Sequence, residues 1–291
     1  MLRLLLFLAL FTAVSTAYTA HGIDWEGVRF EKDVDYLGPE RQEKADLYFP
    51  EKLSPEQRCP AIVIIHGGGW TGGDKGAARE QNIGTNFARH GYIGMSINYV
   101  LATPDTKEPA WPQNLHDCLT AVRWLRKNAD RLQVAPERIG VIGGSAGGHL
   151  AAMLGVTRAE DGLDPSGPYA EYSCRVQCAI DMYGPMLWFA QRDLPMFRQK
   201  RAEAPDLYQA ATPMTHVNPK TPPILILHGT EDKVVSLEDS KAFDSALEKA
   251  GVEQQFVIVE GAGHSFDLEP KQKDLRPLVF EFLDKHLQSK P

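Results

Sequence analysis

A single hydroxyl group lies within a run of glycines at GGSAG, residues 143–147. This G-x-S-x-G pattern stands between a short apolar stretch and an alanine-rich stretch, which is the strand-to-helix setting of a nucleophile elbow. Glycines flank such a serine because its backbone is strained and a neighbouring Cβ would collide with the turn. The motif lacks the lysine of a P-loop and the spacing of a dinucleotide loop. We therefore predict that Ser145 is a catalytic nucleophile.

A second glycine-rich motif, HGGGW, follows an earlier apolar run. Acyl transfer to a serine needs backbone N–H groups that converge on the oxygen that becomes negative, and glycines allow that close approach. We expect this oxyanion hole to be formed by the amides of Gly68, Gly69 and Ala146, with Trp70 as a further contributor. His66 is interpreted as a structural residue that holds the loop.

A serine nucleophile needs a histidine to accept its proton and a carboxylate to orient that histidine. After a nucleophile elbow, the acid precedes the histidine along the chain. The segment HGTEDKVV offers Asp232, which we predict as the acid, with Glu231 as the alternative. The segment GAGHSF supplies His264, which we predict as the base. His286 also follows the acid, but it belongs to an amphipathic terminal segment that reads as a helix.

Short, almost continuously apolar runs precede these motifs and must position them. Strands of this kind are typical of a parallel sheet that is buried on both faces. Apolar residues recur at helical spacing at 115–125 and 243–250, the second with Ser236 as N-cap and Gly251 as its stop. The irregular stretch 35–50 is predicted to contribute antiparallel edge strands. The sequence thus predicts an α/β fold with a mostly parallel, doubly wound sheet. The predicted strands are 61–67, 92–99, 138–144, 176–184, 223–229 and 255–261.

Composition narrows the possible partners. The 291 residues, 43% of them hydrophobic, are enough for one large domain, and no linker divides them. The net charge is −7 with acidic and basic residues mixed throughout, so no basic stripe is available for nucleic acid or anionic lipid. We expect neutral or uncharged partners, no nucleic-acid partner and no cofactor or metal; the oligomeric state stays open.

The N-terminal segment 1–17 carries an early arginine, an apolar run and then small residues, which predicts a secretory signal peptide. Cleavage is expected after Ala17, with Ala20 as the alternative. A retained membrane anchor is the other interpretation, although the run is shorter than the roughly 20 residues that span a bilayer. We expect the mature domain, 18–291, to be secreted or periplasmic, without stable membrane insertion.

Export also affects the interpretation of the cysteines. They lack the paired spacing of a metal site, and an oxidising compartment allows disulfides in any of three pairings. Cys174 with Cys178 is the local pair. Free buried thiols are an equally ordinary outcome. The chain's cysteines are Cys59, Cys118, Cys174 and Cys178.

These motifs carry a family resemblance over roughly residues 23–288. The chain resembles the α/β-hydrolase esterases related to hormone-sensitive lipase, and more narrowly the bacterial bifunctional feruloyl and acetyl esterase domains that act on decorated plant polysaccharides. The resemblance rests on HGGGWTGGDK, the segment around GGSAGG, CAIDMYGP, PPILILHGTEDKVV and GAGHSF. It implies an α/β-hydrolase fold and a serine esterase of short-chain or feruloyl esters, such as those of xylan. Val100 replaces the arginine usual in these relatives, and Ser236 replaces a proline, which affects the expected substrate.

The least regular stretch, 184–222, is rich in aromatic and charged side chains and is predicted to form a small cap over the sheet. Trp188 and Phe189 could stack on an aromatic acyl group, although ordinary packing within the cap is the favoured interpretation. The alternative functions are a lipase-like carboxylesterase of small lipophilic esters, an arylformamidase, a serine peptidase and a non-catalytic binding module.

Overall fold

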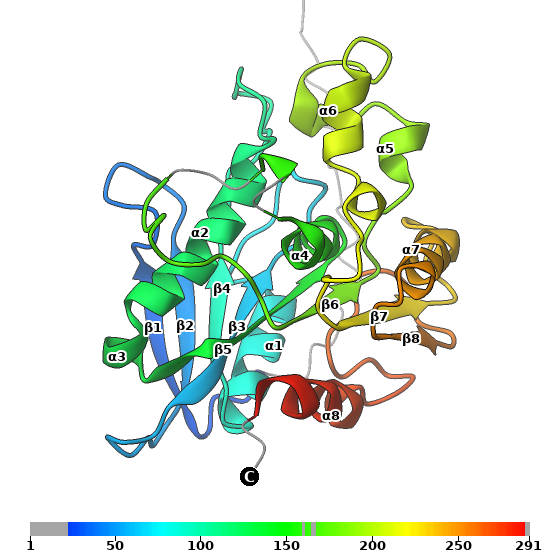
Figure 1. The fold of residues 1–291 in the computed structure, drawn as a ribbon. Helices are drawn as coiled ribbons and strands as arrows, with labels where there is room; N and C mark the ends of the chain where they lie inside the picture. The colour runs from blue at the N-terminus through cyan, green and yellow to red at the C-terminus, as the bar shows by residue number, and fades with distance from the viewer. Residues whose placement is uncertain (1–22, 159–160, 164–166, 289–291) are drawn as a thin grey trace, which may run out of the picture.

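The computed structural model describes residues 23–158, 161–163 and 167–288 (Figure 1). The predicted signal peptide, residues 1–17, lies outside the described residues, as do both of its predicted cleavage positions. Within the described ranges, no helix has the length and apolar character needed to cross a bilayer.

The fold is built on one eight-stranded sheet in the order β1-β2-β4-β3-β5-β6-β7-β8. The pairs β1–β2 and β2–β4 are antiparallel, and all the other neighbouring strands are parallel. The six predicted parallel strands are confirmed. The strands are β1 (Val28–Val34), β2 (Ala45–Pro50), β3 (Cys59–Ile65), β4 (Ile93–Ile97), β5 (Val134–Gly144), β6 (Cys178–Met182), β7 (Ile224–Gly229) and β8 (Gln254–Val259).

The first edge strand is where the structure differs from the sequence prediction. Only β2 lies inside the predicted stretch 35–50, whereas β1 precedes it. The residues of β1 are half-buried or exposed and include Arg29, Glu31 and Lys32, so they lack the apolar run that identified the other strands. A polar strand is ordinary at the edge of a sheet, where its charges discourage pairing with a further chain.

Helices cover both faces of the sheet, as the doubly wound prediction requires (Figure 1). Alternate residues of each strand point to opposite faces, so that Val63 joins the core beneath α2 and α4, while Ile62 and Ile64 join the core beneath α1 and α8. The helices are α1 (Ala78–Arg89), α2 (Gln113–Lys127), α3 (Ala129–Leu132), α4 (Ala146–Val156), α5 (Trp188–Gln191), α6 (Pro205–Ala210), α7 (Leu237–Lys249) and α8 (Arg276–Leu287).

The segment between β6 and β7 contains α5, α6 and two short 3-10 turns, and Figure 1 shows α5 and α6 above the sheet, at the top of the view. Its aromatic residues are largely packed inside it. Phe189 is 1% exposed and stacks on His149 with 4.5 Å between ring centroids. The expectation that Phe189 could stack on a substrate ring is therefore wrong, because both of its faces belong to the core.

The four cysteines all lie within the described residues, and none of them forms a disulfide in the structure. Cys59, Cys118 and Cys178 lie in β3, α2 and β6 and are buried, and Cys174 is half-buried. The disulfide interpretation, including the local pair Cys174 with Cys178, is therefore not realised. Burial raises the pKa of the Cys178 thiol above its ordinary value, as expected for a thiol that packs as a small apolar group.

Candidate active site

Ser145 lies at the turn between β5 and α4 with φ 57° and ψ −123°, a strained conformation for a residue with a side chain. The flanking glycines leave no room for a side chain. A Cβ on Gly147 would lie 2.1 Å from the carbonyl oxygen of Ile65, and a Cβ on Gly143 would lie 2.1 Å from that of Gly147. These contacts give the physical reason for the G-x-S-x-G pattern: the elbow is pressed against the end of β3.

Three predicted residues from distant segments meet at this turn. His264 Nε2 lies 3.0 Å from Ser145 Oγ, and His264 Nδ1 lies 2.6 Å from Asp232 Oδ2. Each of the three residues follows the carboxyl end of a parallel strand: β5, β7 and β8. With Nδ1–H donating to the carboxylate, Nε2 is left to accept the proton of the serine hydroxyl. The array can convert a neutral serine into a nucleophile.

The carboxylate of Asp232 is fully withdrawn from solvent. Its Oδ1 accepts hydrogen bonds from the backbone amides of Val234 at 2.8 Å and Val235 at 2.9 Å, and its Oδ2 contacts two imidazoles, those of His264 and His228. Burial raises the pKa of Asp232, but these hydrogen bonds outweigh burial and hold its pKa well below the ordinary value. The alternative acid, Glu231, is exposed.

The HGGGW loop approaches the serine with strained backbone, since Gly68, Gly69 and Trp70 have φ of 111°, 62° and 60°. A Cβ on Gly68 would lie 2.1 Å from the carbonyl oxygen of Gly72. Within the described part of the chain, the amides of Gly68, Gly69, Trp70 and Ala146 donate to no protein acceptor. Unpaired amides beside a nucleophile are able to stabilise a developing oxyanion.

His66 begins this loop and is 1% exposed. Its Nδ1 lies 2.6 Å from the carbonyl oxygen of Gly67, and its ring stacks on Tyr99 with centroids 4.4 Å apart. The Tyr99 hydroxyl in turn donates to the carbonyl oxygen of His66. Burial lowers the pKa of His66, so the ring is neutral and shapes the loop from beneath.

A cavity of about 430 Å³ opens above Ser145 and His264. The remaining wall is mostly small or polar, with Val234 as its main apolar side chain. The residues that line the cavity are His66, Gly67, Gly68, Gly69, Gly73, Asp74, Ala77, Arg79, Glu80, Ser145, Val234, His264 and Ser265.

A buried ion pair that the sequence analysis missed forms part of this wall. Arg79 Nε donates to Glu80 Oε1 at 2.9 Å, and Arg79 Nη1 donates to the hydroxyl of Tyr183 at 2.9 Å. That hydroxyl donates onward to the carbonyl oxygen of Phe266, and the Tyr183 ring lies 4.9 Å from the ring of His264. No motif marked these residues, because their meeting depends on how α1 packs against the end of β6.

Trp188 does not line the cavity above Ser145. It lines a neighbouring cavity of about 480 Å³ together with Arg192, Asp232, Lys233 and Val234, and Val234 belongs to both cavities. The Arg192 guanidinium carbon lies 4.1 Å from the centre of the Trp188 ring. Trp70 is 1% exposed, so its ring offers no face on which a substrate ring could stack.

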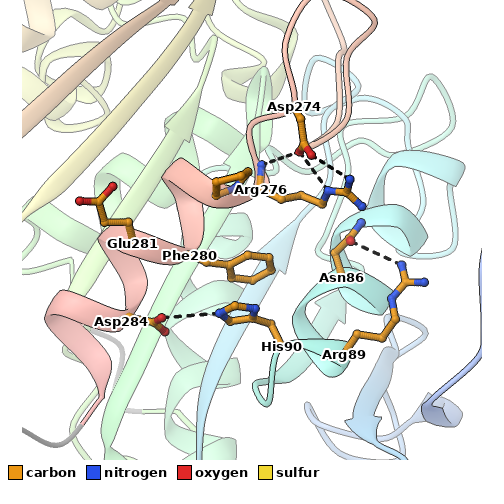
Figure 2. Close-up of a pocket in the computed structure, with 9 residues that line it drawn as sticks. Asn86, Arg89, His90, Asp274, Arg276, Phe280, Glu281 and Asp284 are labelled. Carbon is orange, nitrogen blue, oxygen red and sulfur yellow. Dashed lines mark hydrogen bonds and ion pairs between the residues drawn. The ribbon is translucent and has the colours of Figure 1, made fainter.

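A larger cavity of about 810 Å³ lies between α1 and α8, and none of the three reactive residues lines it. Figure 2 shows that Arg276 pairs with Asp274 and that His90 contacts Asp284, while His90 stacks on Phe280. This cavity offers no nucleophile. Among the described residues, no group of three or more histidine, cysteine, aspartate or glutamate side chains is arranged to hold a metal ion.

Comparison with known proteins finds similarity to esterases. The family model described as BD-FAE matches residues 45–247. Esterase LipQ of Mycobacterium tuberculosis is 30% identical over 251 residues, 81% of this chain, but the chain spans only 57% of the length of LipQ. Ethyl acetate hydrolase of Pseudomonas putida is 28% identical over 83% of this chain and 78% of its own length.

Among solved structures, a truncated carbohydrate esterase from gut microbiota superposes with a TM-score of 0.79 at 25% identity. The superposition covers 90% of this chain and 97% of that structure. The family match extends over most of the chain and includes the elbow, the HGGGW loop and the Asp232 loop. The protein therefore belongs to the BD-FAE family and has the α/β-hydrolase fold.

Proposed function

We propose that this protein is a serine carboxylesterase, in which Ser145, His264 and Asp232 are the catalytic triad. The observation that carries the proposal is the continuous hydrogen-bonded array from Ser145 Oγ through His264 to a buried carboxylate, at the floor of a cavity. The esterases among the relatives support the same reaction class.

In this mechanism, Ser145 Oγ attacks the ester carbonyl carbon while His264 Nε2 takes the hydroxyl proton. Asp232 stabilises the imidazolium that forms, because its negative charge lies 2.6 Å from Nδ1. The amides of Gly68, Gly69 and Ala146, with Trp70 as a contributor, hold the oxyanion. The proton then passes from Nε2 to the leaving alkoxide, the alcohol departs, and water repeats the sequence to release the acid.

We propose that the substrates are short-chain or feruloyl esters on plant polysaccharides such as xylan. A cavity of about 430 Å³ that is lined largely by glycines and small side chains suits a small acyl group better than a long alkyl chain. The neighbouring cavity beneath Trp188 offers an aromatic ring and charged groups, a combination that suits a sugar or a feruloyl ring. The similarity to a carbohydrate esterase and to an ethyl acetate hydrolase supports both parts of this assignment.

The assignment includes export after removal of residues 1–17. N-terminal sequencing of protein recovered outside the cytoplasm should then begin near Tyr18, whereas a retained Met1 in the membrane fraction would indicate an anchored enzyme.

The substrate proposal is tested with acetylated xylan, methyl ferulate, N-formylkynurenine and p-nitrophenyl esters from acetyl to octanoyl. We expect kcat/KM to fall as the acyl chain lengthens, because a longer chain clashes with the wall of a cavity of this size and gains none of the roughly 0.8 kcal/mol per methylene that burial in a pocket would give. Acetate or ferulate should be released from xylan fragments. A preference for octanoyl esters without release from xylan would indicate a lipase-like enzyme, and preferential cleavage of N-formylkynurenine an arylformamidase.

A further inference from the structure

A second imidazole contacts the carboxylate of Asp232. His228 lies in β7, four residues before Asp232, and its side chain is fully buried. Its Nε2 lies 3.3 Å from Asp232 Oδ2 and 3.1 Å from the carbonyl oxygen of Val235, and its Nδ1 lies 2.7 Å from the hydroxyl oxygen of Ser240 on α7. Every other side chain of β7 is apolar, so packing alone does not explain an imidazole at this position.

The neighbours of His228 determine where its proton lies. A carbonyl oxygen and a carboxylate oxygen only accept hydrogen bonds, so Nε2 carries a hydrogen, which donates to the carbonyl oxygen of Val235 and is shared with Asp232 Oδ2 at 3.3 Å. Ser240 is able to donate its hydroxyl proton to Nδ1, which satisfies the other nitrogen of the ring. Asp181 and Asp239 are the other acidic groups that interact electrostatically with His228. Each of them also accepts backbone hydrogen bonds, Asp181 from Gly184 and Asp239 from Met186 and Leu187.

The Nε2–H group of His228 completes the set of hydrogen-bond donors around the carboxylate of Asp232. Asp232 Oδ1 accepts hydrogen bonds from two backbone amides. Asp232 Oδ2 contacts two imidazoles, that of His264 at 2.6 Å and that of His228 at 3.3 Å. Backbone amides from the following loop and an imidazole from the preceding strand together restrict rotation of the carboxylate. Without His228, one donor to a fully buried charge is lost, which is costly because water cannot replace it.

We infer that His228 is a positioning residue of the active site, which holds Asp232 through Nε2–H so that the carboxylate keeps the ring of His264 directed at Ser145. Ser240 pairs with Nδ1 of His228 and is the outermost member of the array. The inference rests on the proposed function, because the array has this purpose only where Ser145 is the nucleophile.

Two substitutions of His228 distinguish the effect of losing the hydrogen-bond donor from the effect of losing the volume of the ring. In His228→Gln, the side-chain amide nitrogen can occupy the position of Nε2 and still donate to Asp232. In His228→Leu, a similar volume remains and the donor is lost. We expect kcat of His228→Leu to fall by about 10- to 100-fold with little change in KM, as for loss of a hydrogen bond to a charged group. His228→Gln should retain kcat within about threefold, a smaller change than loss of that bond produces.

The matched control is His90→Leu, since His90 lies in the cavity of Figure 2 and contacts none of the three reactive residues. It should leave kcat unchanged. Equal loss in His228→Gln and His228→Leu, or wild-type kcat in His228→Leu, would show that the donor does not matter.

A readout without substrate keeps this inference separate from the proposed esterase activity. The proton between His264 Nδ1 and Asp232 should give a downfield resonance in the proton NMR spectrum of the wild-type protein. We expect it to persist in His228→Gln and to broaden or vanish in His228→Leu. An unchanged resonance in His228→Leu overturns the inference, even if the wild-type protein hydrolyses no ester.

Should His228→Leu fail to fold, Ser240→Ala provides the same test by a milder route. Without the Ser240 hydroxyl, Nδ1 of His228 loses its partner and the ring is less firmly oriented. We expect kcat to fall by about three- to tenfold, the size of one neutral hydrogen bond. A wild-type kcat together with an unchanged downfield resonance would contradict the role of His228.

Discussion

At the scale of single residues, the reactive groups differ in how much water reaches them. The side chain of Asp232 is fully buried and that of His264 is 14% exposed at the edge of the cavity. The acid is therefore held by fixed donors, whereas the base meets the substrate and exchanges protons with it. This division follows from the loops that carry them, because the Asp232 loop folds its own amides back onto the carboxylate.

Asp232→Asn tests which acid orients the histidine. An amide at this position would present the wrong hydrogen-bonding group to His264 Nδ1 and favour the wrong tautomer, so we expect kcat to fall by about 10⁴-fold. The matched change, Glu231→Gln, alters an exposed neighbour and should leave kcat unchanged. Steady-state rates on p-nitrophenyl acetate decide between them, and a larger loss in Glu231→Gln would mean that the acid is misassigned.

Asp181 provides a prediction about stability and pH. Burial raises its pKa to about 7, well above the value of an unfolded aspartate, so the folded protein binds an extra proton between about pH 4 and pH 7. The contribution of this group to stability is present at low pH and is lost as pH rises through about 7. Asp181→Asn removes that dependence, so its Tm relative to wild type should rise by several degrees from pH 5 to pH 8.

Differential scanning calorimetry at the two pH values measures this change, with Asp105→Asn on an exposed loop as the matched control. If the Tm difference between Asp181→Asn and wild type were the same at both pH values, Asp181 would not titrate in this range.

At the scale of elements, two glycines of α4 differ in whether the structure leaves room for a side chain. A Cβ on Gly147 would meet the carbonyl oxygen of Ile65 at 2.1 Å, whereas a Cβ on Gly155 would meet Ala179 Cβ at an ordinary 3.4 Å. The first glycine lets the elbow reach β3. The second is an unforced glycine inside a helix, where alanine is the better helix former.

Gly147→Ala should therefore displace the elbow and lower kcat by at least about 100-fold, comparable to the loss of an oxyanion donor. Gly155→Ala, in the same helix, should keep kcat and gain about 0.5–1 kcal/mol of stability. Paired measurements of kcat and urea unfolding check both variants. Wild-type turnover in Gly147→Ala would contradict the packing argument.

The helices and strands also show what the sequence predicts well and where prediction fails. Apolar runs predicted the parallel strands, and Ser236 was correctly predicted as the N-cap of α7, where its hydroxyl accepts from the amide of Glu238. The edge strand β1 was missed because its residues are polar. Arg79 and His228 were missed as parts of the site because their partners come from other elements, which no local pattern reveals.

At the scale of the whole molecule, the sheet brings reactive loops from β3, β5, β7 and β8 to one place, and the insertion after β6 adds the neighbouring cavity. Open α/β sheets bind their ligands at the carboxyl ends of the strands for this reason. The cavity between α1 and α8 is larger but remote from this meeting of loops, so size alone does not identify the site.

The most direct test of the central claim is the rate of p-nitrophenyl acetate hydrolysis by wild type and Ser145→Ala, with circular dichroism as the check on folding. The wild-type protein should hydrolyse the ester, and Ser145→Ala should keep the fold while losing more than about a thousandfold in kcat. His264→Ala should lose a similar amount, and the double variant little more, because the two residues act as one unit. A folded Ser145→Ala protein with near-normal turnover would contradict the assignment of Ser145 as the nucleophile.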